Sequence, residues 1–110
     1  MATATFVQDG SSIDYTPAGD VAAGDVVVLN DLVGIARQPI AAGAPGSLAV
    51  AGVFEMPKAT GAGTAIAAGV KLYWDAANTQ ATETATDHTY LGKAVAAAGD
   101  DEATVRVRLA

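Results

Sequence analysis

Few residues of this 110-residue chain could carry out acid–base or nucleophilic chemistry. His88 is the only histidine, and cysteine is absent. A histidine-activated serine would have to be Ser11, Ser12 or Ser47, and nothing in their spacing links them to the imidazole. His88 lies in a polar, threonine-rich segment, which favours a surface histidine. A single histidine with scattered carboxylates is also a poor zinc site, so we expect no metal and no cofactor.

The remaining polar motifs do not assemble a catalytic pattern either. The cluster Asp100-Asp101-Glu102 lacks the alternating ligands of a calcium loop, so it is interpreted as a charged turn. The Gly-Lys pair at Gly92-Lys93 is not part of a phosphate-binding GxxxxGK[ST] loop. We therefore expect the protein not to be an enzyme.

The charge balance is acidic, with twelve Asp and Glu against six Lys and Arg, for a net charge of −6. Nucleic-acid binding usually requires a basic stripe. The densest basic stretch is Arg106 with Arg108, interpreted as a solvated strand face, so no direct nucleic-acid partner is expected. No apolar run approaches the roughly 20 residues of a membrane span, and no signal segment opens the chain. We therefore expect no membrane association, and a protein that is made in a cytoplasm and either stays there or leaves by a route other than secretion.

Turn residues interrupt the chain every few positions, and the segments between them are short and rich in Val, Thr, Ile and Tyr. This spacing predicts an all-β fold with little or no helix. "TFVQDGSSIDYT" (residues 5–16) predicts a hairpin that turns at Asp9-Gly10. "GDVVVLN" (residues 24–30) predicts a buried strand, and "SLAVAGVFEM" (residues 47–56) predicts one central strand. In "ATVRVRL", apolar residues alternate with the two arginines, which predicts one buried and one exposed face.

Two parts of the chain resemble each other. Val21-Ala-Ala-Gly matches Ile66-Ala-Ala-Gly at an offset of 45, and "LVGIA" matches "YLGKA" at an offset of 58. The difference is a 13-residue insertion within the threonine-rich stretch, which predicts a strand-loop excursion or a mobile flap. An internal duplication with half-repeats 21–56 and 66–109 is one interpretation, and chance similarity is the other. Two such units would form a compact β-barrel or β-clip in a single domain, residues 8–110, preceded by an N-terminal arm, residues 1–7.

Tyr73 and Trp74 are adjacent large aromatics in a predicted strand. Adjacent strand residues point to opposite faces, so one is expected in the core and the other toward solvent or a partner. Tyr and Trp are frequent anchors of protein interfaces. Both residues are therefore interface candidates, and packing beneath the threonine-rich stretch is the alternative.

Four segments resemble the small head-decoration, or capsid cement, proteins of bacteriophages. They are "FVQDGSSIDYTPAGDVAAGDVVVLNDLVGIA", "VAGVFEMPKATG", "IAAGVKLYWDAAN" and the closing "TVRVRL". The resemblance extends from Phe6 to Leu109, and "GVFEMPK" and "KLYWDAAN" are its most specific parts. It implies a β-tulip-like or β-clip fold and a homotrimer on the exterior of the virion. It also implies binding to the major capsid protein after the shell expands, which would stabilise the shell against the pressure of packaged DNA.

The N-terminal arm is the expected capsid-binding element. Its residues Ala2, Thr3, Ala4, Thr5 and Phe6 are uncharged and alternate in a β-prone pattern, so the arm could add as an edge strand to a capsid sheet. The alternative is that the arm pairs with the following strand inside its own domain.

Two other functions remain open at this point. The protein could be another phage structural or adaptor protein, such as a tail or baseplate accessory. A small β-clip nucleotide hydrolase is less well supported, because its carboxylates Asp20, Asp25 and Asp75 occur in turns without a supporting basic or serine pattern.

Overall fold

The computed structural model describes residues 4–5 and 10–109, and in this part of the chain it contains nine β-strands and no helix. The strands are β1 (Ser12–Tyr15), β2 (Val26–Leu29), β3 (Leu32–Ile35), β4 (Gly46–Ala49), β5 (Val53–Pro57), β6 (Lys71–Asp75), β7 (Gln80–Thr82), β8 (Thr89–Ala94) and β9 (Thr104–Leu109). The all-β prediction is confirmed. Most of the predicted hairpin's first strand lies outside the described residues, and its second strand is β1.

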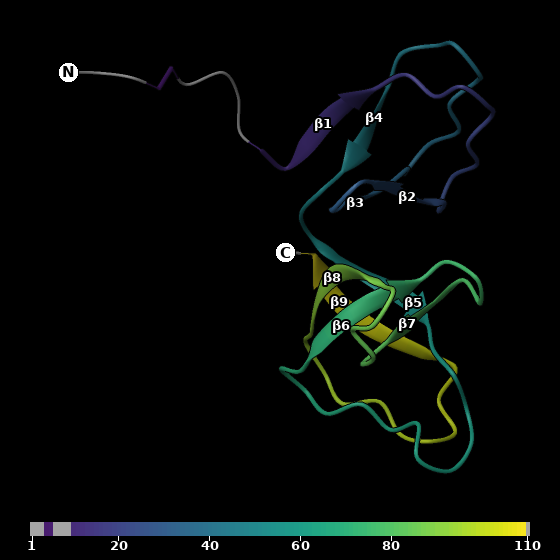
Figure 1. The fold of residues 1–110 in the computed structure, drawn as a ribbon, viewed down its shortest axis with the longest axis vertical. Helices are drawn as coiled ribbons and strands as arrows, with labels where there is room; N and C mark the ends of the chain where they lie inside the picture. The colour runs from purple at the N-terminus through teal and green to yellow at the C-terminus, as the bar shows by residue number, and fades with distance from the viewer. Residues whose placement is uncertain (1–3, 6–9, 110) are drawn as a thin grey trace.

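The strands form two antiparallel sheets that lie one above the other in Figure 1. The first sheet has the order β1-β4-β3-β2 and the second β5-β9-β8-β6-β7. Neither sheet closes into a barrel, so the barrel form of the prediction was wrong. "SLAVAGVFEM" is also not one strand, because the chain leaves the first sheet after Ala49 and enters the second at Val53. A continuous apolar run cannot reveal the bend at Ala51-Gly52.

The second sheet repeats the strand order of the first and adds β7 beyond β6. We call residues 12–50 the first module and residues 53–109 the second module. The registers correspond as well, because Ala49 pairs with both Ser12 and Ile35 in the first module, and Arg108 pairs with both Val53 and Lys93 at the equivalent positions of the second. This common order supports the predicted duplication, which stays a prediction, and it moves the start of each unit back to β1 and β5.

The same turn also precedes β2 and β6. Gly24 and Gly69 both have a positive φ, 91° and 88°, a conformation that glycine adopts without steric cost. The amide of Gly24 donates to Ala36 O at 2.6 Å, and the amide of Gly69 donates to Ala94 O at 2.7 Å. The residues matched at offsets 45 and 58, Gly24 with Gly69 and Ala36 with Ala94, therefore form the same backbone hydrogen bond in both modules.

The two modules differ in how well their apolar residues are covered. The second module contains the larger cluster of buried residues, including Leu72, Trp74, Leu91 and Val107. Val33 and Ile35 of β3 join this cluster, and β3 contacts β8, so the modules pack at these two equivalent strands. The first module's own cluster has three buried members, Ala36, Ile40 and Leu48, among the described residues; its other members are half-buried: Ile13, Tyr15, Val21, Val27 and Leu29.

The insertion accounts for this difference. It follows β6, contains β7, and places Ala81 of β7 in the core with 2% of its surface exposed. Lys58, the residue after β5, forms a single isolated parallel bridge with Ala81 of β7, which brings the chain after β5 next to β7 without closing the sheet. In the first module a turn at Asn30-Asp31 connects β2 directly to β3, and β2 is an edge strand. The expectation of a buried strand at residues 24–30 was therefore wrong for the single chain, in which β2 is only partly buried.

Candidate functional site

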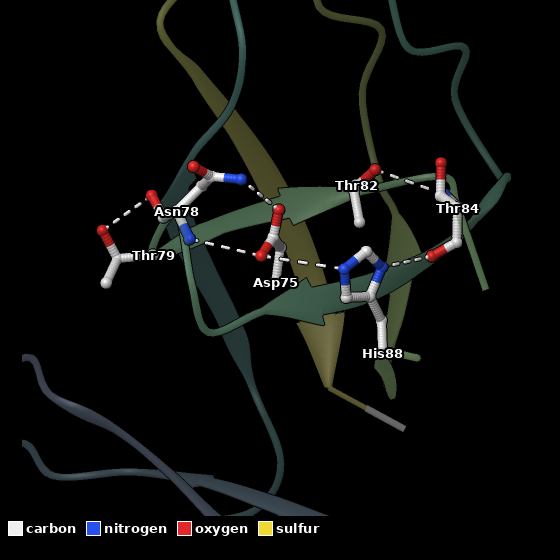
Figure 2. Close-up of polar contacts among 6 residues, drawn as sticks. All are labelled: Asp75, Asn78, Thr79, Thr82, Thr84 and His88. Carbon is white, nitrogen blue, oxygen red and sulfur yellow. Dashed lines mark hydrogen bonds and ion pairs between the residues drawn. The ribbon is translucent and has the colours of Figure 1, made fainter. Parts of the chain in front are cut away.

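The one histidine belongs to a polar cluster at the end of β6, shown in Figure 2. Asp75 accepts hydrogen bonds from the side-chain amide of Asn78 at 2.8 Å and from its backbone amide at 3.2 Å. His88 Nε2 lies 3.7 Å from Asp75 Oδ1, and His88 Nδ1 lies 2.8 Å from Thr84 O. Because a carbonyl only accepts, we assign the Nδ1 proton to this bond.

The hydrogen bonds of this cluster connect the end of β6 to the residues that follow it. Ser12 and Ser47, two of the serines considered from the sequence, lie on β1 and β4 of the other sheet. Hydrogen bonds from Asn78 hold the pKa of Asp75 below its usual value, and the nearby imidazole of His88 contributes in the same direction, against the opposing effect of burial. The surface-histidine prediction needs adjustment, because the side chain of His88 is only 21% exposed.

The lowered pKa of Asp75 predicts that the fold loses stability in acid. A carboxylate with a depressed folded-state pKa contributes stability above its unfolded pKa, and this contribution is lost as the pH falls through the folded value. We expect wild-type stability to decline below about pH 4, and Asp75→Asn to flatten that decline. Urea unfolding between pH 2.5 and 7 measures both, with the exposed turn variant Asp31→Asn as control. An unchanged acid slope in Asp75→Asn would contradict this role.

A second polar site was not anticipated from the sequence. Lys58 is buried, with 5% exposure, and its ammonium donates to the carbonyls of Ala59, Gly99 and Glu102 at 2.8, 2.9 and 3.0 Å. The side chain therefore ties the end of β5 to the loop that precedes β9. The sequence "PKAT" is typical of an exposed turn. Lys58 is buried only because the fold brings the loop of Gly99 and Glu102 next to it.

Exposed cations gather on the outer face of the second sheet. Lys71 pairs with Lys93 and Lys93 with Arg108 across β6, β8 and β9, so three cations form a row. Arg106 lies 3.7 Å from Glu55, and both side chains are more than half exposed; such surface pairs contribute little to stability. The expectation that Arg106 and Arg108 lie on a solvated strand face is confirmed, although the row with the lysines appears only in the fold.

Tyr73 and Trp74 lie on opposite faces of β6, as strand geometry requires. Trp74 packs in the core with 8% exposure and pairs with Ala81 of β7. Tyr73 is half-buried on the other face, where its ring lies 5.7 Å from that of Tyr90. A contact between Tyr73 and a partner stays a prediction, whereas Trp74 is accounted for by the core.

The candidate residues of the N-terminal arm are only partly visible. Ala4 and Thr5 are exposed and lie in no strand. Ala2, Thr3 and Phe6 fall outside the described residues, so a capsid contact of the arm stays a prediction.

Within residues 4–5 and 10–109, no three His, Cys, Asp or Glu side chains are arranged to hold a metal ion. A search of the same residues found no helix that could span a bilayer.

A comparison with protein families gives the clearest assignment. The family model described as phage cement protein matches residues 7–109, which includes both modules. Searches of curated proteins and of solved structures found no match. The match covers almost the whole chain, agrees with the resemblance noted in the sequence, and shows that the chain belongs to the phage cement protein family, whose members have a structural, capsid-associated role.

Proposed function

We propose that the protein binds the outside of the expanded phage shell through the major capsid protein, as a homotrimer, and stabilises the shell against the pressure of packaged DNA. The observation that carries this proposal is the family match across residues 7–109. The polar cluster of Asp75, Asn78 and His88 is compatible with it, because its hydrogen bonds hold the segment after β6 in place.

The physical mechanism is linkage. A ligand that binds the expanded shell and not its dissociated subunits stabilises the shell by RT ln(1 + [L]/Kd), about 2.7 kcal/mol per site when the ligand is at a hundred times its Kd. Three linked protomers bind more tightly than one, because the second and third contacts form at a high effective concentration. Rigid, short-stranded modules suit this role because little conformational entropy is lost on binding.

Binding to isolated heads tests the proposal. We expect the purified protein to decorate expanded, undecorated heads of its phage at regular positions visible by cryo-electron microscopy, and to raise the temperature at which filled heads release DNA. Tails purified from the same phage are the control. Decoration of tails and not of heads would favour the adaptor alternative and contradict the proposal.

The N-terminal arm is the first element to remove. Deleting residues 1–5 is expected to leave both sheets intact, because β1 begins at Ser12. We expect the deletion to weaken binding to heads by about tenfold or more, because a β-prone arm that adds to a sheet edge supplies main-chain hydrogen bonds and links subunits. Titration of heads with wild type and deletion, followed by pelleting, measures this. Equal occupancy at every concentration would show that the arm does not contribute.

A further inference from the structure

The outer face of the second sheet concentrates the positive charge of an acidic chain. Of the six Lys and Arg side chains, Lys58 is buried and Arg37 belongs to the first module. The other four are exposed on this face: Lys71, Lys93, Arg106 and Arg108. Two carboxylates share it, Glu55 opposite Arg106 and Asp75 within its hydrogen bonds to Asn78. The charge of this face is therefore opposite in sign to the net charge of −6.

Three of the cations lie in positions that do not favour a stable sheet. Lys71 is the cross-strand partner of Lys93, and Lys93 is the partner of Arg108; we call these three residues the cation row. Like charges directly opposite each other on neighbouring strands are destabilising. Among the described residues none of the three forms an ion pair, whereas Arg106 lies 3.7 Å from Glu55. Proteins usually break such local rules at functional sites.

Apolar and aromatic side chains complete the same face. Val53 continues the row on β5 and is 56% exposed. Val95, whose amide donates to Arg106 O at 3.0 Å, is 45% exposed. The paired rings of Tyr73 and Tyr90 lie on this face as well. Tyrosine and arginine are enriched in protein interfaces, where they supply much of the binding energy, so the composition of the face fits a protein partner.

We propose that this face docks on the shell and binds an acidic surface of the major capsid protein. The proposal deepens the proposed function and rests on it, because it assigns a face and a chemistry to that contact. Complementary charge orients an acidic protein as it approaches, since this face is attracted while the rest of the chain is repelled. The valines and tyrosines are then buried when the two surfaces meet.

Two other occupants fit the face less well. A second copy offers few free carboxylates, because several of its exposed ones already accept hydrogen bonds from backbone amides in their own module: Asp20, Asp25 and Asp100. A nucleic acid carries continuous negative charge, which would extend beyond the row onto a chain with a net charge of −6. A local acidic patch on a protein avoids that repulsion.

Charge reversal at the centre of the row tests the proposal on expanded, undecorated heads. We expect Lys93→Glu to weaken binding by about tenfold or more at about 50 mM salt, because an attraction becomes a repulsion. The loss should shrink at about 500 mM salt, where charges are screened. Arg37→Glu is the matched control, since it changes the net charge equally at an exposed position of the first module; it should bind within about twofold of wild type.

The fold should tolerate this change. A glutamate at position 93 lies between Lys71 and Arg108 and removes the like-charge contacts, so urea unfolding should find Lys93→Glu at least as stable as wild type. The milder Lys93→Gln should show the same loss of binding to a smaller extent. Equal binding of Lys93→Glu and wild type, or an equal loss in Arg37→Glu, would overturn the proposal.

Two further measurements test the other occupants. Light scattering without heads should give Lys93→Glu the wild-type mass, and a DNA duplex should bind neither protein. A change of mass would assign the face to a second copy, and DNA binding that Lys93→Glu loses would assign it to nucleic acid; either result overturns the proposal. A wild type that binds no heads contradicts the proposed function itself, whereas head binding that Lys93→Glu retains overturns only this inference.

Discussion

Replacing Gly92 by alanine is expected to destabilise the protein by about 3 kcal/mol or more, a large share of the 5–15 kcal/mol typical of a domain. Gly92 lies in β8 between β6 and β9. A Cβ there would lie 2.0 Å from the carbonyl oxygen of Arg108 and 3.1 Å from Cα of Leu109. Both are backbone atoms that cannot rotate away, so β8 and β9 must separate. Urea unfolding monitored by Trp74 fluorescence measures the loss.

Gly34 is the matched control, because it is the equivalent glycine of the first module at the offset of 58. A Cβ at Gly34 would meet Leu48 Cβ at 2.9 Å and Leu48 Cδ1 at 3.1 Å. Leu48 Cδ1 can rotate away, whereas Leu48 Cβ moves only with the β4 backbone, but a contact of 2.9 Å needs a far smaller shift than the 2.0 Å contact at Gly92, so we expect Gly34→Ala to cost about 1–3 kcal/mol. A Gly92→Ala variant no less stable than Gly34→Ala would show that the second sheet tolerates the separation.

Replacing Lys58 by methionine is expected to cost about 2–4 kcal/mol. Methionine keeps most of the apolar stem but removes the ammonium, so its part-buried hydrogen bonds to the carbonyls of Ala59, Gly99 and Glu102 are lost. A hydrogen bond to a charged group contributes about 1.5–3 kcal/mol, and water can reach the carbonyls of these exposed residues and offset part of the loss. The loop before β9 should also become more accessible to protease.

Lys71→Met is the control for this substitution. Lys71 is an exposed lysine of the same sheet, and surface changes of this kind usually stay within about 0.5 kcal/mol. Equal stability of the two variants would contradict the role assigned to Lys58. Urea midpoints and limited proteolysis, measured side by side, give the comparison.

The sequence predicted the local features of this fold better than its long-range ones. In β9 buried and exposed residues alternate as predicted. Val105, Val107 and Leu109 are buried, and Arg106 and Arg108 are exposed. The offsets between the two halves join positions with equivalent hydrogen bonds, because the turns at Gly24 and Gly69 are encoded by the same few residues.

The features that were missed depend on contacts between segments far apart in the chain. Nothing in "PKAT" shows that Lys58 meets the carbonyl of Gly99, 41 positions later. The cluster of Asp75 and His88 likewise forms only once the insertion folds back beside β6. The prediction that residues 24–30 form a buried strand was wrong, because β2 lies at the edge of its sheet. Positions where the sequence pattern disagrees with the fold are often functional surfaces.

The unequal covering of the two cores has a consequence for hydrogen exchange. Amides of β8 and β9 lie between paired strands over an enclosed core, so deuterium reaches them mainly when the whole chain unfolds. Amides of β2 lie at an open edge over half-buried side chains, and small fluctuations are enough to label them. We therefore expect deuterium to label β2 of the first sheet well before β8 and β9 of the second.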